Sequence, residues 1–163
     1  MTFCILGSDR ANNQIGIAYS TVTLAGGGTS PYYSHGGDIV VVQAYGNLST
    51  AQRGAMALDA GETSEQALAA MQAHDPAFEH RQIGIMARNG TPLARTGVDT
   101  RPWAGHVVGD DFIAMGNVLV GEGVVDAMAA SFADTTPGEP LADRLLSALE
   151  AGRDAGGQAA PDN

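Results

Sequence analysis

Lysine is missing from this chain and cysteine occurs only once, and both facts exclude whole classes of chemistry. All eight cationic residues are arginine, so a lysine Schiff base, a lysine general base and the lysine of a phosphate-binding loop are excluded. Because Cys4 is the single cysteine, neither an internal disulfide nor a multi-cysteine zinc site can form. The Gly26–Gly28 run lacks the spacing of a phosphate loop and is interpreted as a linker.

Long apolar runs and a basic surface are missing as well. No apolar run approaches the length of a membrane span, and residues 1–7 lack the pattern of a secretory signal, so we expect a soluble, cytoplasmic protein. The net charge of −10 at pH 7 repels phosphate backbones and anionic lipids. We therefore expect no nucleic-acid and no membrane partner. The histidines show no ligand spacing, so we expect no metal and no cofactor.

Period-two patterns and turn residues predict several strands, most of them in hairpins. A polar turn joins the first two strands, and Asn89-Gly90 between two later ones is a strong hairpin signal. Residues 26–31 are interpreted as a flexible connection. The predicted strands are residues 2–7, 14–22, 39–44, 82–88, 91–97 and 112–119.

Four helices are predicted from their start signals and apolar stripes. Ser49–Gln52 and Thr63–Gln66 both match the capping box, in which a hydroxyl and a Gln side chain satisfy free backbone donors. Gly61 ends the first of these helices. The later two helices carry the stripes Val124, Val125, Met128, Phe132 and Leu141, Leu145, Leu146, Leu149.

The order of these elements predicts an α+β fold. Strands that arrive as hairpins favour antiparallel sheets, and helices that arrive in pairs favour covering layers. A four-layer α/β/β/α sandwich of two mainly antiparallel sheets accommodates both, and a two-layer α+β domain is the alternative. We expect one domain over residues 1–157 and a short polar tail over residues 158–163.

Several fragments spread along the chain resemble one known family in order and spacing. They are Thr2–Leu6 with Asp9, Gln43-Ala44, Arg81–Gly84, Thr96-Gly97, Pro102–His106, Gly116-Asn117 and Leu141–Leu146. The family they resemble is domain-of-unknown-function family 1028, and the similarity runs from residue 2 to about residue 157. The resemblance implies a sandwich like that of the N-terminal-nucleophile (Ntn) hydrolases, and it implies no established reaction.

The sequence departs from the family pattern at two places. Ser20-Thr21 stands where the family usually has serine-lysine at the end of the second strand. The segment after Gly156-Gly157 is also shorter than the apolar strand that the family pattern continues into. We therefore expect one sheet to lack a strand, or to borrow one, and we expect a homodimer that covers the open sheet edge.

Thr2 is the candidate catalytic residue. Methionine is usually trimmed before a small residue, and the α-amine left on Thr2 could then accept the proton of its own hydroxyl near neutral pH. A retained Met1 would block that mechanism. Cys4 lies two residues further on, so both side chains point to the same face of a strand, where the thiol either assists or simply fills the core.

The remaining candidates are substrate-binding residues. Gln43 and Asn117 end buried strands, where side-chain amides can hold a substrate carbonyl, complete an oxyanion hole or satisfy buried backbone groups. Trp103 and His106 suggest a pocket wall with an acid or base, or else a packed corner. Arg81, or alternatively Arg10, is a candidate source of the positive charge that a lysine would otherwise supply.

Together these residues favour a protein that hydrolyses a small amide or peptide bond through Thr2, without a metal. A ligand-binding or assembly protein without turnover on the same scaffold is the alternative. A self-compartmentalised peptidase has the same layers, and the missing lysine disfavours it.

Overall fold

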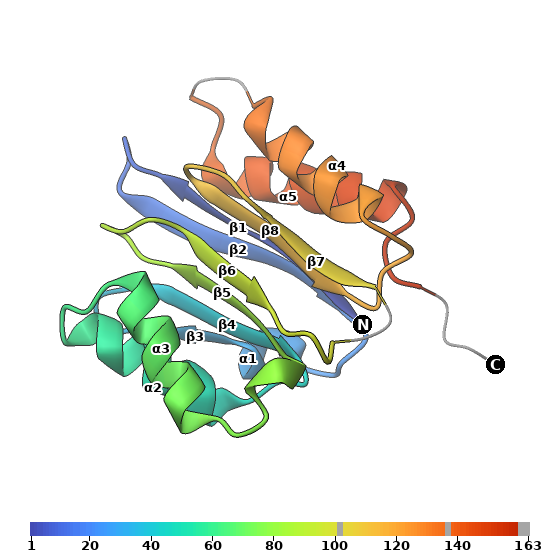
Figure 1. Cartoon of the computed structure of the whole chain (residues 1–163). Helices are drawn as coiled ribbons and strands as arrows, with labels where there is room; N and C mark the ends of the chain where they lie inside the picture. Colours follow the sequence, from blue (N-terminus) through green and yellow to red (C-terminus); the bar gives the residue numbers. More distant parts are fainter. Residues whose placement is uncertain (101–102, 136–137, 160–163) are drawn as a thin grey trace.

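The strands form two separate antiparallel sheets in the computed structural model, which describes residues 1–100, 103–135 and 138–159 (Figure 1). The first sheet has the order β2-β1-β8-β7, and the second has the order β3-β4-β5-β6. The strands of the first sheet are β1 (Thr2–Asp9), β2 (Gln14–Thr21), β7 (Ala104–Val108) and β8 (Phe112–Asn117). Those of the second are β3 (Pro31–Tyr33), β4 (Ile39–Ala44), β5 (Arg81–Met86) and β6 (Leu93–Thr96).

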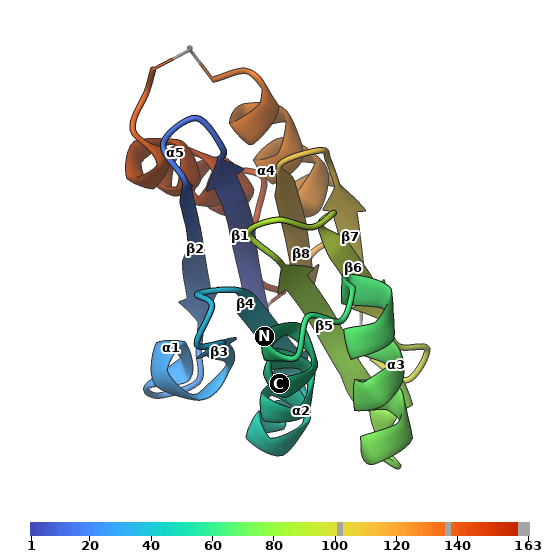
Figure 2. The same cartoon turned by 90° about the vertical axis from the view of Figure 1, so that its left-hand side faces the viewer.

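The long helices cover the outer faces of the sheets in pairs, and Figures 1 and 2 show the resulting α/β/β/α order of layers. Helices α4 (Gly123–Ala133) and α5 (Leu141–Asp154) cover the first sheet, and α2 (Leu48–Asp59) and α3 (Ser64–His74) cover the second. A short helix α1 (Gly26–Thr29) and a 3₁₀ turn (Phe78–His80) complete the described chain. The predicted α+β class with two antiparallel sheets is confirmed, and the two-layer alternative is wrong.

Three buried apolar clusters hold the layers together. One lies between the first sheet and α4/α5, and another lies between the second sheet and α2/α3. The third fills the space between the sheets with Cys4, Leu6, Ile39, Val41, Met86, Ile113 and Met115. Because side chains alternate along a strand, each central strand supplies both an outer and an inner cluster, which explains its nearly unbroken apolar sequence.

The structure corrects four details of the predicted elements. Gly26–Thr29 is a helix rather than a linker, and strands β3 and β7 had not been predicted. The side chain of Asn47, not that of Ser49, caps α2 by accepting from two backbone N–H groups. The capping box of Thr63 and Gln66 is confirmed.

No helix in residues 1–100, 103–135 and 138–159 is long and apolar enough to cross a membrane.

The end of the described chain pairs beside β8. The N–H of Val120 donates to the carbonyl of Gly157, and the N–H of Ala159 donates to the carbonyl of Val118. Leu119 and Gln158 form an antiparallel bridge. Both sheets have four strands within the described residues, and the end of the described chain adds only this one bridge, so a strand missing relative to the family pattern stays a prediction. The homodimer stays a prediction.

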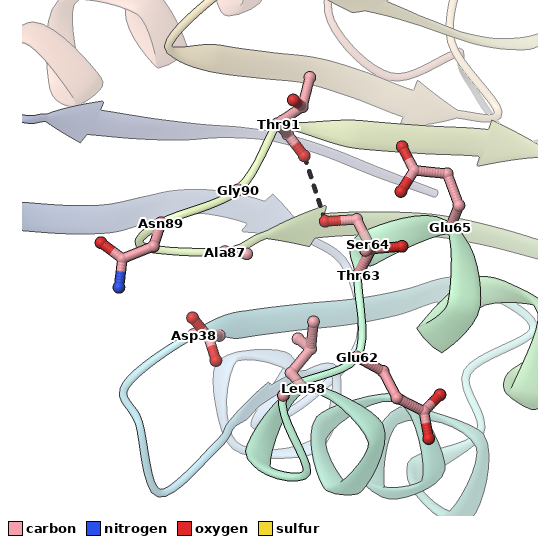
Figure 3. Close-up of a pocket in the computed structure, with 11 residues that line it drawn as sticks. Asp38, Leu58, Glu62, Thr63, Ser64, Glu65, Ala87, Asn89, Gly90 and Thr91 are labelled. Atoms are coloured by element: carbon pink, nitrogen blue, oxygen red, sulfur yellow. Dashed lines mark hydrogen bonds between the residues drawn. The ribbon is translucent and has the colours of Figure 1, made fainter.

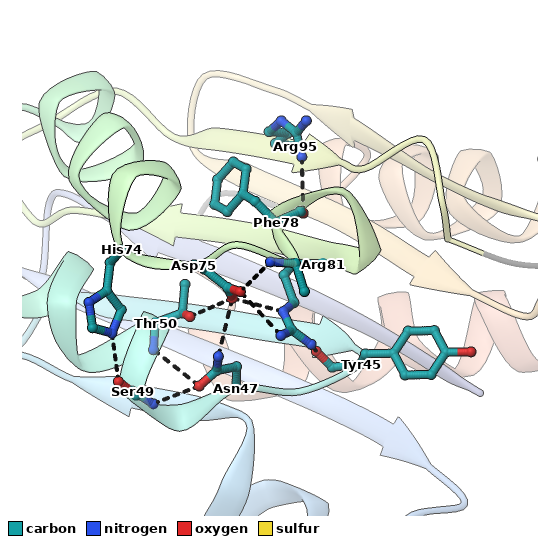
Figure 4. A network of polar contacts seen from close by, with 10 residues as sticks. Tyr45, Asn47, Ser49, Thr50, His74, Asp75, Phe78, Arg81 and Arg95 are labelled. Atoms are coloured by element: carbon teal, nitrogen blue, oxygen red, sulfur yellow. Dashed lines mark hydrogen bonds and ion pairs between the residues drawn. The ribbon is translucent and has the colours of Figure 1, made fainter.

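A buried carboxylate ties α2 to the start of β5, as Figure 4 shows. The Asp75 side chain is only 1 % exposed and forms an ion pair with Arg81 at 2.9 Å. It also accepts from the Thr50 hydroxyl at 2.6 Å and from the N–H of Ala77 at 2.9 Å. Burial alone would raise the pKa of Asp75, but the hydrogen bonds from Arg81, Thr50 and Ala77 outweigh it and hold the pKa well below its usual range.

We predict that Asp75→Asn lowers the free energy of unfolding by roughly 3 kcal/mol, because it leaves the mostly buried Arg81 guanidinium without its counter-charge. A depressed folded pKa contributes stability above the unfolded pKa of about 3.9, and that contribution is lost as pH falls further. The wild type should therefore lose stability more steeply than Asp75→Asn below about pH 4. Urea unfolding at several pH values tests this. The exposed Asp126→Asn is the control, and equal slopes for wild type and Asp75→Asn would contradict the account.

Candidate functional site

The space between the sheets changes from apolar to polar at the end where β1 begins. At this end, next to the apolar cluster between the sheets, four strands each carry one buried polar residue. These residues are Thr2 on β1, Gln43 on β4, Gln82 on β5 and Asn117 on β8. Each is at most 5 % exposed. Since each lies two residues from a member of the inter-sheet cluster or from a residue that faces it, alternation directs all four side chains between the sheets.

The Gln82 side chain joins these strands into one network of hydrogen bonds. Its Oε1 accepts from Gln43 Nε2 at 2.8 Å and from Asn117 Nδ2 at 3.2 Å. The two hydrogens of its Nε2 are shared among three acceptors, namely Thr96 Oγ1 at 2.9 Å and the carbonyl oxygens of Gly105 at 3.0 Å and Gly116 at 2.9 Å. Gln43 Oε1 accepts in turn from the Cys4 thiol at 3.4 Å. We call these side chains the Gln82 network, which consists of Cys4, Gln43, Gln82, Thr96 and Asn117.

Thr2 lies at the edge of this network beside a small cavity. Its hydroxyl is 3.0 Å from that of Thr21, its partner across the β1–β2 pair. The Thr21 hydroxyl also donates to the carbonyl of Met1 at 3.2 Å. The cavity holds about 70 Å³ and is lined by Thr2, Tyr19, Thr29, Ser30 and Gln43 among others.

Helix α1 closes over Thr21 and the cavity. A side chain at Gly26 would collide with Thr21 and come close to Tyr19, so only glycine permits this approach. Gly26, the first residue of the run interpreted from sequence as a linker, therefore forms part of the wall around Thr2.

The site carries no formal charge near neutral pH. Burial raises the pKa of the Cys4 thiol and that of the Tyr19 hydroxyl, so both stay protonated. Desolvation lowers the pKa of His106, which favours its neutral form. None of the residues that line the cavity within the described chain is charged. Burial also lowers the pKa of the Met1 α-amine.

Two strained residues come directly after Gln43 and Asn117 in the sequence, Ala44 as the last residue of β4 and Val118 just beyond β8. Ala44 has a φ of 70° and Val118 has a φ of 55°, in the left-handed region that non-glycine residues rarely adopt. Such a conformation costs on the order of 1–3 kcal/mol, most for a β-branched residue, and it persists where the surrounding structure enforces it. Both strained residues lie at the polar end of the sandwich, which is typical of a functional site.

Comparison with known proteins places the whole described chain in one family. The model of DUF1028, a family of unknown function, matches residues 2–163. The chain belongs to this family. It is also similar to a crystal structure of protein SPO2555 from Silicibacter pomeroyi, assigned to DUF1028, with 29% sequence identity and a TM-score of 0.86. That similarity covers 94% of this chain and 70% of the other. No curated protein matches the chain.

This DUF1028 chain lacks the lysine that the family pattern has at the end of the second strand, and the position concerned lies at the site. The resemblance expects lysine where Thr21 stands, and Thr21 is the residue hydrogen-bonded to Thr2. A cation at this position would lie beside the Thr2 hydroxyl, whereas the chain places a neutral hydroxyl there. Any activation of Thr2 must therefore come from another group.

The structure brings together five of the seven candidate residues of the sequence analysis. Thr2, Cys4, Gln43 and Asn117 face one another between the sheets, and His106 joins through a contact of 2.8 Å between Nδ1 and Thr96 Oγ1. Arg81 and Trp103 lie elsewhere.

Arg81 and Trp103 face the covering helices rather than the space between the sheets. Arg81 is next to Gln82 on β5, so it points to the opposite face, where it binds Asp75 and the carbonyl of Tyr45. Trp103 packs against the apolar cluster under α4 and α5 and covers Gly105. In this DUF1028 chain neither side chain contacts the cavity beside Thr2.

Four residues of the site were missed from sequence, namely Tyr19, Thr21, Gln82 and Thr96. A signal existed for Gln82, because it is the one amide within the run Gln82–Met86, whose other residues are apolar or glycine. Tyr19 and Thr21 follow the same period-two face as Ile15 and Ile17, but only the pairing of β2 with β1 places them beside Thr2.

A second cavity of about 450 Å³ lies at the other end of β5, as Figure 3 shows. The start of α3 and the Asn89-Gly90 turn form its walls, and Ser64 Oγ donates to the carbonyl of Thr91 across it. Asp38, Glu62 and Glu65 give it an acidic lining without a nucleophile activated by a base. Nowhere in the described residues do three or more His, Cys, Asp or Glu side chains cluster so as to hold a metal ion.

We predict that Gln82→Met lowers the free energy of unfolding by at least about 2 kcal/mol, although methionine has a similar volume. The substitution leaves the buried amide nitrogens of Gln43 and Asn117 without their acceptor, and each such loss costs about 1–3 kcal/mol. The matched control is Gln72→Met on the exposed face of α3. Denaturant unfolding of both variants tests the prediction, which fails if the two lose the same stability.

Proposed function

We propose that this protein is an Ntn-type amidohydrolase, in which Thr2 becomes the nucleophile once Met1 is removed. The observation that carries the proposal is the place of Thr2. It is a buried hydroxyl at the first position of a central strand, between two sheets and beside a cavity lined by neutral polar groups. The α/β/β/α order of layers agrees with the Ntn-like sandwich that the family resemblance implies.

The free α-amine of Thr2 serves as the base in this proposal. An α-amine has an ordinary pKa of about 7.7–8.0, so part of it is unprotonated near neutral pH and can accept a proton. The amine takes the proton of Oγ1, which attacks the amide carbonyl and forms an ester to Thr2 as the C–N bond breaks. The departing amine leaves with the proton, and water then hydrolyses the ester.

The cavity favours a small, uncharged amide as substrate. Its volume of about 70 Å³ accommodates an acyl group of a few atoms, and none of its described lining residues would compensate a charge. An unpaired ion in such surroundings is strongly disfavoured. Gln43 Nε2 uses one hydrogen for Gln82 and retains a second, which can stabilise the oxyanion that forms during attack.

A ligand-binding or assembly protein without turnover is the second candidate. The observation in its favour is that Thr21 offers Thr2 only a neutral hydroxyl where the family pattern expects lysine. Such a protein would use the same cavity and would show ligand-dependent melting shifts without a covalent adduct.

A small, uncharged β-lactone tests the nucleophile. We predict that the chain with a free Thr2 amine gains the mass of one lactone and that peptide mapping places it on residue 2. Thr2→Ser should retain the adduct. Thr2→Ala should lose the adduct. Because this variant still has a free α-amine, it also controls for direct acylation of the nitrogen. Thr91→Ala at the far end of the sandwich should behave as wild type. An adduct that persists in Thr2→Ala would contradict the proposal.

The rate of this acylation should depend on pH through the α-amine. Only the unprotonated amine accepts the hydroxyl proton, so the rate should rise with pH and level off above the amine's pKa. The midpoint of the profile therefore reports the pKa of the Thr2 α-amine, whose ordinary value is about 7.7–8.0. Mass spectrometry of timed samples between pH 5 and pH 9 measures the profile. A rate without dependence on pH in this interval would exclude the amine as the base.

A further inference from the structure

Asn117 carries a buried acceptor that no donor satisfies within the described chain. Its side chain is 1 % exposed, and its Oδ1 atom has no hydrogen-bond partner. A buried carbonyl without a donor costs about 1–3 kcal/mol. Among the buried side-chain atoms that lack a hydrogen-bond partner in the described chain, it is the one at the Thr2 end of the space between the sheets.

The orientation of the Asn117 amide is fixed by the Gln82 network. Gln82 Nε2 faces three acceptors, so its Oε1 must point to Gln43 and Asn117. Turning the Asn117 amide over would bring its oxygen against Gln82 Oε1 and replace a hydrogen bond with a repulsion. The unsatisfied atom is therefore the oxygen, and the missing group is a donor.

The backbone N–H of Thr2 points toward β8. The carbonyl of Met1 faces β2, because it accepts from the N–H of Val22 and from the Thr21 hydroxyl. In a trans peptide the carbonyl and the following N–H point in opposite directions. The nitrogen of Thr2 is thus directed away from β2 and toward β8, where Asn117 is the residue paired with it.

We propose that Asn117 is a positioning residue whose side-chain carbonyl accepts a hydrogen bond from the α-amine that Met1 removal creates at Thr2. The inference rests on the proposed function. The peptide N–H of Thr2 has one hydrogen, whereas an α-ammonium has three, so processing supplies the donor that the buried oxygen lacks. The Thr2 hydroxyl is already paired with Thr21, which leaves the amine as the matching group.

The other groups that face Thr2 carry no charge that would obscure this contact. They come from β1, β2, β4 and β5, and they are Cys4, Tyr19, Thr21, Gln43 and Gln82. The titratable ones are the Cys4 thiol and the Tyr19 hydroxyl, and burial raises the pKa of both. His106 is reached only through Thr96, and desolvation lowers its pKa. A change in the pKa of the amine on substitution of Asn117 then reports the contact itself.

The absence of lysine makes the α-amine directly measurable, because it is the single primary amine of the chain. We would generate Thr2 as the first residue in every variant by cleaving a removable N-terminal fusion. The amine is then available whether or not the cell removes Met1. The rate of carbamylation by cyanate, measured against pH, gives the pKa of this amine alone.

We expect Asn117→Leu to lower the pKa of the Thr2 amine by about one unit, which is a tenfold change in its protonation equilibrium. Asn117→Asp should raise it, since a carboxylate favours the ammonium form. The exposed Asn12→Leu is the matched control and should leave it unchanged. Thermal melts confirm that each variant is folded, and Asn117→Ser replaces Asn117→Leu if the latter is not.

An unchanged pKa in folded Asn117 variants would overturn this inference and show that Asn117 is only a structural part of the network. The same result together with normal β-lactone labelling of Thr2 would leave the proposed function standing. If the β-lactone does not label wild type but the Asn117 variants show a clear shift in the pKa of the Thr2 amine, the contact is supported and the catalytic role of Thr2 is rejected.

Discussion

The buried amide of Gln82 is the interaction on which the polar end of the sandwich depends. Two β-sheets pack well through apolar side chains, and a polar group between them is tolerated only when it is hydrogen-bonded. Gln82 reaches residues of β4, β6, β7 and β8 from its own strand β5. It therefore connects both sheets and fixes the side-chain amides of Gln43 and Asn117. Without it, the groups around Thr2 would have no defined orientation.

The surroundings of Thr2 are polar but neutral, and this combination limits the chemistry. The nearest cation of the second sheet, Arg81, is committed to Asp75 on the opposite face of β5. The thiol of Cys4 lies deeper in the core with its pKa raised by burial. The neutral imidazole of His106 contacts Thr96 rather than Thr2, and the described partner of the Thr2 hydroxyl is the hydroxyl of Thr21. The α-amine of a processed chain is the base that remains, and the unsatisfied oxygen of Asn117 faces the strand that carries it.

Local patterns predicted most of the fold, because hairpin turns, capping boxes and apolar periods act over a few residues. The β1–β2 and β5–β6 hairpins and the long helices follow from such signals. Strand β7 was not predicted because its sequence, Ala104–Val108, has no clear alternation of apolar and polar residues. The Gly26–Thr29 helix was not predicted because glycine disfavours helices. Thr2, Gln43 and Asn117 were predicted from their places at strand ends. The role of Gln82 and the neighbourhood of Thr21 depend on pairing between distant segments, which no local pattern contains. The prediction of Arg81 as a site residue did not consider that side chains alternate along a strand, so Arg81 and Gln82 point to opposite faces of β5.

The intact mass of the protein, expressed from its own initiator methionine without a tag, tests the central claim most directly. The account predicts a mass lower than that of the full sequence by one methionine residue, which exposes the α-amine of Thr2. A mass that includes Met1 would contradict it, because the carbonyl of Met1 would then keep its contacts with Thr21 and Val22 and the site would hold no base.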